Sequence, residues 1–196
     1  GAMRVVALVP GGGPNLPAVL DAGADGSLTG VEVVAVGADL PGTGGVERGE
    51  AHGAAGFVVA PGDYASRADW DAALAEAVAG FEPDLVLSSG FMRILGEPFL
   101  NRFGVRTMKT HPARLPSFPC AHGVRDALAY GVKVTGCTVH WVDAGVDTGP
   151  IVAQRAVEVL EGETEEALHE RIKVAERELL VATLGRLAAG ELRFPA

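Results

Sequence analysis

An apolar run at residues 3–9 is the feature that most constrains the fold, because a strand buried on both faces of a sheet has this pattern. Similar short apolar segments recur along the chain and alternate with segments of helical period. We expect strands at residues 3–9, 31–36, 57–59, 84–89, 105–111, 134–142 and 151–159. We expect helices ending near Gly23 and spanning residues 46–52, 70–78, 124–130 and 164–187, with Ser66 and Thr164 as caps of the third and the last. The alternation predicts an α/β fold with a Rossmann-like, mostly parallel sheet and helices on both faces.

The length of 196 residues suits one domain, expected over residues 1–196, with Gly1 and Ala2 as a remnant left before Met3 by expression cloning. No apolar run reaches membrane-spanning length and no signal-like segment opens the chain, so a cytoplasmic protein is expected. The formal net charge of -9 argues against a nucleic-acid or anionic-membrane partner. The sequence leaves the oligomeric state open.

The chain has two cysteines, Cys120 and Cys137, and no paired metal-ligand spacing, so we expect no metal site. Two free thiols are the simplest interpretation. Cys120 stands beside the suspected site, which leaves a reactive thiol as the alternative.

A glycine-rich turn at residues 11–15 joins the first strand to the first helix. Glycines allow a ligand close to the backbone, and a helix N-terminus offers free N–H groups, so phosphate fits this environment. A tight turn without any ligand is an equally good interpretation, since the turn lacks both the Walker and the full dinucleotide patterns.

Lys109 and His111 lie two residues apart on one predicted strand, so their side chains leave the same face. Asp147, in a glycine-rich loop, could orient the imidazole of His111 and support acid–base work. Ligands of such sheets bind beyond the carboxyl ends of the strands, where the glycine-rich turn, the loop at residues 91–95 and His111 are all expected. His140 alternates within an apolar strand and is predicted to be structural.

In order along the chain, these segments resemble the glycinamide ribonucleotide transformylases, a family of 10-formyltetrahydrofolate-dependent formyltransferases. The resemblance covers nearly the whole chain, from the turn at residues 11–16 to Asp147-Thr148-Gly149-Pro150. It includes the loop at residues 89–95, the His111-Pro112-x-x-Leu115-Pro116 segment and Gly136-x-Thr138-Val139-His140. It implies formyl transfer from 10-formyltetrahydrofolate to the amine of glycinamide ribonucleotide, a step of purine biosynthesis.

The resemblance also assigns residues. Those implied for the substrate are Gly12, Gly13, Pro14, Asn15 and Glu176. Those implied for the folate are Arg67, Met92, Arg93, Ile94, Leu95, Val142 and Asp143. His111 and Asp147 would be catalytic, and Lys109 stands at the position of the family's catalytic asparagine.

The ammonium of Lys109 is a poor geometric substitute for the rigid amide of asparagine, which donates to the formyl oxygen. We therefore expect impaired transfer. Lys109 could still donate to that oxygen, or it could form an ion pair with Asp147 and draw that residue away from His111. A divergent or inactive relative that binds folate or nucleotide, and a formyltetrahydrofolate hydrolase, are the alternative functions.

Overall fold

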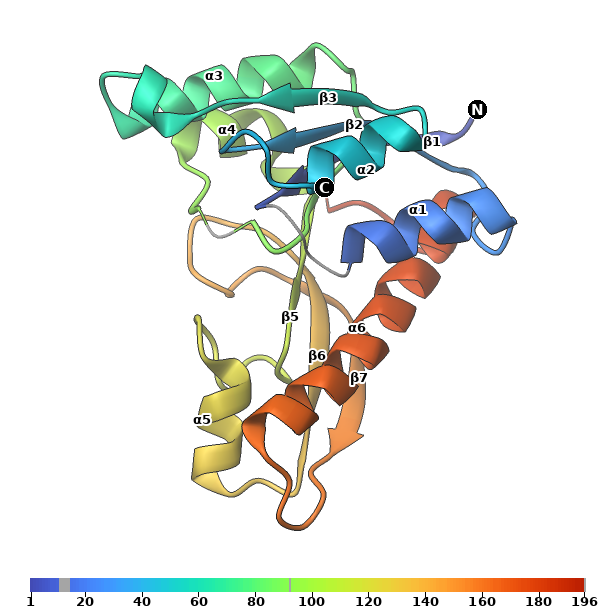
Figure 1. The fold of residues 1–196 in the computed structure, drawn as a ribbon, viewed down its shortest axis with the longest axis vertical. Coiled ribbons are helices and arrows are strands. Elements are labelled where there is room, and N and C mark those ends of the chain that lie inside the picture. Colours follow the sequence, from blue (N-terminus) through green and yellow to red (C-terminus); the bar gives the residue numbers. More distant parts are fainter. Residues whose placement is uncertain (11–14, 92, 196) are drawn as a thin grey trace.

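The computed structural model describes residues 1–10, 15–91 and 93–195 (Figure 1). Its strands are β1 (Met3–Val9), β2 (Val31–Ala38), β3 (Ala55–Val58), β4 (Leu85–Ser88), β5 (Thr107–His111), β6 (Val134–Trp141) and β7 (Ile151–Glu158). Its helices are α1 (Asn15–Asp25), α2 (Gly45–Ala51), α3 (Arg67–Ala79), α4 (Glu97–Phe103), α5 (Gly123–Tyr130) and α6 (Glu165–Ala188). Short 3-10 turns occupy Pro61–Asp63 and Gly104–Arg106.

Within the described residues the strands form one seven-stranded sheet in the order β3-β2-β1-β4-β5-β6-β7. The pairings from β3 to β5 are parallel, whereas β6 pairs antiparallel with both β5 and β7. This arrangement confirms the predicted α/β, mostly parallel fold. Because β1, β4 and β5 run in one direction, their carboxyl ends lie at one edge of the sheet.

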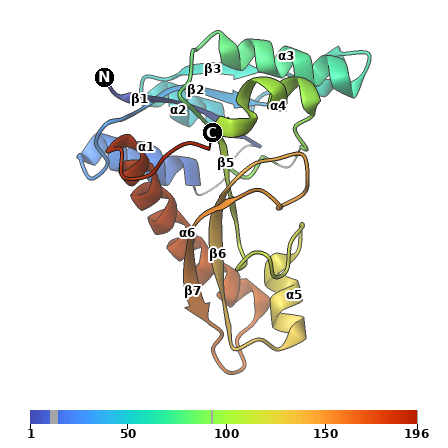
Figure 2. The ribbon, with the colours of Figure 1, turned by 180° about the vertical axis from the view of Figure 1, so that it is seen from behind.

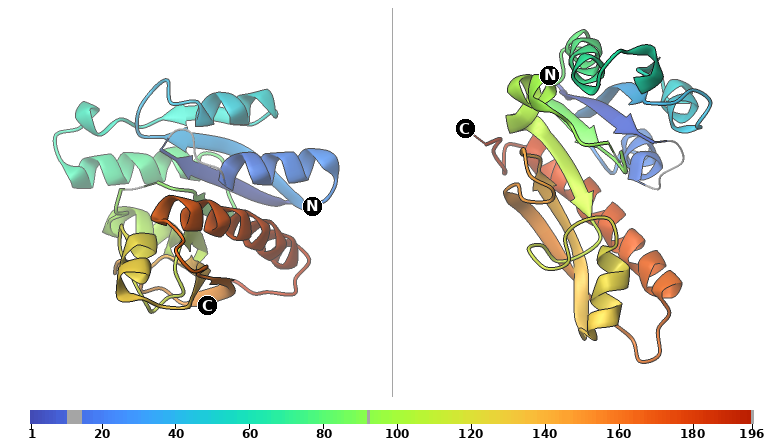
Figure 3. Two further views of the ribbon diagram at one scale, coloured as in Figure 1. Left: turned by 60° about the horizontal axis from the view of Figure 1, so that its bottom comes forward. Right: turned by 90° about the vertical axis from the view of Figure 1, so that its left-hand side faces the viewer.

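The two faces of the sheet bury different helices, as the alternation of side chains along β1 requires. Val6 and Leu8 pack in a core with residues of α3 and α4, among them Trp70 and Phe99. Val5, on the opposite face, belongs to the core that includes residues of α1 and α6. Figures 2 and 3 show α6 running diagonally along the sheet beside β6 and β7.

Local sequence explains where the principal helices begin. Ser66 precedes α3 and its Oγ accepts the Asp69 N–H at 3.1 Å, as expected from the sequence. Thr164 caps α6 in the same way, accepting the Ala167 N–H at 3.1 Å.

Helix α4 was not predicted, and the residue before it, Gly96, has no side chain that could cap it locally. Its start is fixed from outside the helix. The buried carboxylate of Asp71 accepts the N–H groups of Gly96 and Phe99, both at 2.7 Å. A residue that is distant in the sequence, Asp71, therefore caps α4, whereas the adjacent residue Ser66 caps α3. The fifth strand also starts two residues later than predicted, at Thr107, because residues 104–106 form a 3-10 turn.

Candidate functional site

His111 and Asp147 come together at the carboxyl end of β5, as the sequence predicted. His111 Nδ1 lies 3.5 Å from Asp147 Oδ2, and both side chains are almost completely buried. The other ring nitrogen of His111, Nε2, lies 2.8 Å from the carbonyl oxygen of Phe118, so it carries the hydrogen. A proton on Nδ1 as well would make the contact with Asp147 an ion pair. The pair is thus arranged to hold and release a proton.

Asp147 is held by more than His111. Its Oδ2 accepts the backbone N–H of Cys120 at 2.8 Å, and its Oδ1 lies 3.7 Å from His140 Nε2. Asp147 also adopts a left-handed backbone conformation, with φ of 55°. The carboxylate therefore bridges the loop after β5, the strand β6 and its own loop.

His140, which the sequence predicted to be structural, is buried within β6 and its side chain also faces Asp147. His140 pairs with Lys109 in the antiparallel register of β5 and β6. Its Nδ1 lies 3.0 Å from the carbonyl oxygen of Trp141 and carries a hydrogen, which leaves Nε2 without a hydrogen-bond partner among the described residues. Burial lowers the pKa of His140; the Trp141 carbonyl and Asp147 oppose this shift, and Lys109 and His111 add to it. The lowered pKa favours the neutral form of His140 beside His111 and Asp147.

Lys109 does not form the ion pair with Asp147 that the sequence allowed. Asp147 keeps its contacts with the two histidines, and Lys109 has no ion-pair partner among the described residues. Its half-buried side chain leaves β5 on the same face as His111, and its charge acts on His140. The ammonium is therefore free to meet a developing negative charge near His111.

The loop that supplies the Phe118 carbonyl is tied to the antiparallel strands. Thr138 Oγ1 donates to Ala113 O at 2.7 Å and accepts the Leu115 N–H at 3.1 Å. Gln154 Nε2 donates to Leu115 O at 2.7 Å. These bonds of Thr138 and Gln154 fix the first half of the loop against β6 and β7. In the second half of the loop, Cys120 and His122 are exposed.

The predicted substrate residues Asn15 and Glu176 also meet, although they lie 161 positions apart. Asn15 Nδ2 donates to Glu176 Oε1 at 3.1 Å, and Thr110 on β5 contacts both. Gly12, Gly13 and Pro14 lie outside the described residues, so the phosphate turn stays a prediction. Sequence reasoning had not singled out Thr110.

The predicted folate residues of α3 and of the loop after β4 differ in their contacts and exposure. Arg67 Nη2 donates to the carbonyl oxygen of Ile94 at 2.8 Å and so holds the loop after β4. Arg93 pairs with Asp39 and lies over the ring of Trp70. Ile94 is 58% exposed, whereas Leu95 is buried in the core, so among the described residues of the loop Ile94 is an apolar side chain that a ligand could contact. Met92 lies outside the described residues.

Val142 and Asp143 shape the other predicted folate segment. The Val142 N–H donates to Thr107 O at 2.8 Å, which fixes the end of β6 beside β5. Asp143 Oδ1 accepts the Gly145 N–H at 2.9 Å and the Thr148 hydroxyl at 2.6 Å. Asp143 therefore builds the turn that leads to Asp147.

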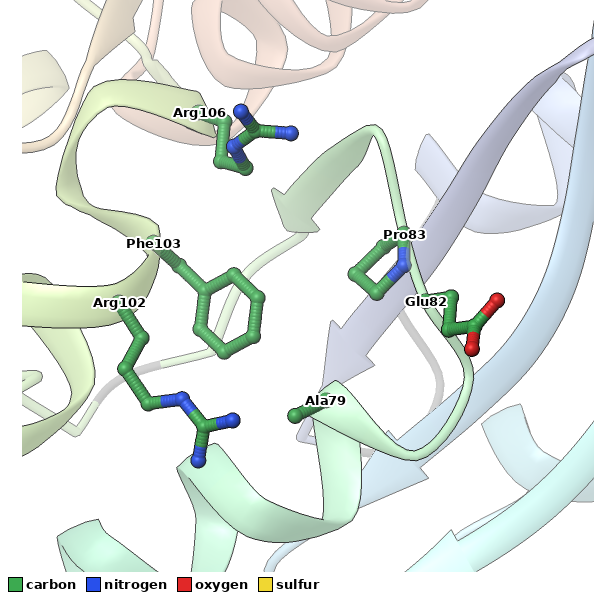
Figure 4. Close-up of a pocket in the computed structure, with 6 residues that line it drawn as sticks. All are labelled: Ala79, Glu82, Pro83, Arg102, Phe103 and Arg106. Carbon is green, nitrogen blue, oxygen red and sulfur yellow. The ribbon is translucent and has the colours of Figure 1, made fainter.

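Two surface hollows lie near α4, and only one is close to these residues. The larger, of about 500 Å³, is lined by Arg67, Asp71, Gly96 and Asn101 among others and adjoins the loop after β4. The smaller, of about 290 Å³, lies among Ala79, Glu82, Pro83, Arg102, Phe103 and Arg106 (Figure 4). Pro83 and Arg106 precede β4 and β5, so the smaller hollow lies at the amino ends of these strands, away from His111.

Within the described part of the chain, His, Cys, Asp and Glu side chains form no group of three that could hold a metal ion. The described helices include none long and apolar enough to cross a membrane.

Comparison with known proteins agrees with this arrangement. Residues 3–184 match the formyl transferase family. The chain is 57% identical over 185 residues to a phosphoribosylglycinamide formyltransferase of Mycobacterium tuberculosis, covering 94% of this chain and 85% of that protein. The fold matches a crystal structure of glycinamide ribonucleotide transformylase 1 from Symbiobacterium toebii with a TM-score of 0.93 and 40% identity, over 100% of this chain and 92% of that one. The Brucella melitensis phosphoribosylglycinamide formyltransferase gives a TM-score of 0.89 with 38% identity, over the whole of both chains.

Proposed function

Because the chain belongs to the formyl transferase family, we propose that it transfers a formyl group from 10-formyltetrahydrofolate to the amine of glycinamide ribonucleotide, in cytoplasmic purine biosynthesis. The observation that carries the proposal is the contact between His111 and Asp147 beside Lys109. On the other side of the same strand, the contact between Asn15 and Glu176 supports a ribonucleotide substrate.

The amine nitrogen attacks the formyl carbon, and the formyl oxygen becomes an oxyanion. The bond from the formyl carbon to N10 of the folate then breaks, one proton leaves the amine and one proton arrives at N10. His111, held by Asp147, is the acid–base group for this traffic, and an imidazolium also stabilises the oxyanion. The neighbouring neutral His140 leaves the single negative charge of Asp147 directed to His111.

Lys109 is the point at which this chain departs from an efficient transferase. Its ammonium has no ion-pair partner among the residues that the structure describes, so it can donate to the oxyanion. A flexible and strongly hydrated ammonium positions that donor less well than a short amide. We therefore propose slow transfer with largely intact ligand binding.

The test is an assay of the purified chain with 10-formyltetrahydrofolate, in the presence and absence of glycinamide ribonucleotide. The expected result is slow deformylation that requires the ribonucleotide and yields its formylated product. Release of formate at the same rate without the ribonucleotide would favour a hydrolase. Binding of both ligands without any turnover would favour an inactive relative. Lys109 is the one observation that supports this alternative.

A further inference from the structure

Three polar side chains form a closed hydrogen-bonded triangle on the α6 side of β5. Thr110 Oγ1 donates to Glu176 Oε1 at 2.6 Å. Asn15 Nδ2 lies 3.1 Å from that same oxygen and 3.1 Å from Thr110 Oγ1. Thr110 is 9% exposed and Asn15 is 5% exposed, so little water reaches these bonds. Each member of the triangle is thus fixed by the other two.

The chemistry of a carboxylate determines how the triangle is oriented. Ionised Glu176 only accepts hydrogen bonds, so both the Thr110 hydroxyl and the Asn15 amide must turn donors toward it. The Asn15 oxygen, Oδ1, consequently points away and has no partner among the described residues. A buried acceptor without a partner is costly, so a ligand that brings a donor to Asn15 Oδ1 gains affinity.

Glu176 offers a second acceptor to the same ligand. Its Oε1 already accepts two hydrogen bonds, whereas Oε2 accepts none from the described residues. A ligand meets two acceptors, Asn15 Oδ1 and Glu176 Oε2, and both require donors. Adjacent hydroxyl groups of a sugar meet this requirement, and an anionic group does not.

We propose that Thr110 is a positioning residue that fixes Asn15 and Glu176 as paired acceptors for the ribose hydroxyls of the substrate, and so sets the preference for a ribose over a deoxyribose. This inference rests on the proposed function, which supplies the ribonucleotide and the roles of Asn15 and Glu176 in binding it; the role of Thr110 is the new part. Thr110 can take this role because one hydroxyl both donates to Glu176 and accepts from Asn15. Its side chain leaves β5 on the face opposite to Lys109 and His111, so it does not touch the reacting atoms.

The test compares Thr110→Val with Thr110→Ser by calorimetric titration with glycinamide ribonucleotide and with its 2′-deoxy and 3′-deoxy analogues. The Thr110 hydroxyl donates to a charged group, so losing it should weaken ribonucleotide binding by about tenfold or more. Binding of the deoxy analogues should change far less, so the ratio between the affinities falls toward one. Thr110→Ser keeps the hydroxyl and should keep the ratio. Titration with a folate analogue should give the same affinity in all variants.

Thr135→Val is the matched control, because Thr135 is also buried but its hydroxyl has no partner among the described residues. It should leave every affinity unchanged. If Thr110→Val kept both the affinity and the preference for the ribose, the inference would be overturned while the proposed function stood. Equal binding of the ribonucleotide and both deoxy analogues by the unchanged chain would overturn it as well, even if Thr110→Val failed to fold. Absence of ribonucleotide binding in the unchanged chain would overturn the proposed substrate itself.

Discussion

The two sides of strand β5 differ in how closely their polar side chains contact one another. On the α6 side, Thr110 joins Asn15 and Glu176 through bonds of 2.6 to 3.1 Å. On the other side, Asp147 lies 3.5 Å from His111 and 3.7 Å from His140, and Lys109 has no ion-pair partner among the described residues. The first side is preorganised for binding. On the second side, bonds of 2.8 Å to the backbone hold His111 and Asp147, but the contacts between the side chains are longer and can change with protonation. The comparison teaches that ligand binding and catalysis can fail separately in this chain.

The largest expected effect concerns only the side of β5 that carries Lys109 and His111. Lys109→Asn should raise the turnover of 10-formyltetrahydrofolate in the presence of glycinamide ribonucleotide by about a hundred- to a thousandfold, which is the usual worth of an oxyanion donor. Affinities for both ligands should change little, because Lys109 lies opposite to Thr110. Steady-state kinetics would measure this, with the exposed Lys133→Asn as control. Robust turnover in the unchanged chain that disappears in Lys109→Asn would instead point to chemistry that requires the lysine.

A second change tests the α6 side of β5. Glu176→Gln removes the charge that organises Thr110 and Asn15, and should weaken the binding of glycinamide ribonucleotide by about thirtyfold. The affinity for a folate analogue should stay the same. Calorimetry would measure both, and Glu178→Gln, two residues along α6 and exposed, is the control. Equal losses in the two variants would show that Glu176 has no specific role.

A third change addresses the folate segment, which belongs to neither side of β5. Ile94→Glu puts a charge on the exposed apolar side chain of the loop after β4, and should weaken binding of a folate analogue by about tenfold. The fold should tolerate it, since this side chain already meets water. Val105→Glu, at a position 47% exposed, controls for the added charge. Unchanged folate affinity in Ile94→Glu would mean that the folate lies elsewhere.

The smallest effect concerns the pH dependence of stability. Burial lowers the pKa of His140 in the folded chain. As the pH falls below the unfolded pKa of about 6.5, His140 therefore binds a proton in the unfolded chain before it does so in the folded chain. Stability therefore falls as the pH drops through this region, by at most about 1.4 kcal/mol per pH unit from this residue. Urea unfolding between pH 7.5 and about 5.5 should show a smaller loss for His140→Asn. The exposed His122→Asn should behave as the unchanged chain does, and an identical pH dependence in all three proteins would contradict the assignment.

Much of the scaffold followed from local pattern. The apolar run of β1, the cap at Ser66 and the cap at Thr164 are short-range features, and each was predicted. Helix α4 was missed because its start depends on the Asp71 carboxylate, 25 positions before the Gly96 N–H that it accepts. Elements that are stabilised by their own residues can be read from sequence, and those fixed by distant contacts cannot.

The sequence by itself determined the sheet, the shared face of Lys109 and His111, and the residue types of an acyl-transfer site, because strand periodicity is a local property. Only the tertiary structure decided which groups meet. It placed His140 beside Asp147 through the register of β5 with β6, directed Asp147 to the histidines, away from Lys109, and closed Thr110 onto Asn15 and Glu176. Register and long-range hydrogen bonds depend on how separate elements pack. A single sequence without its fold does not contain those distances.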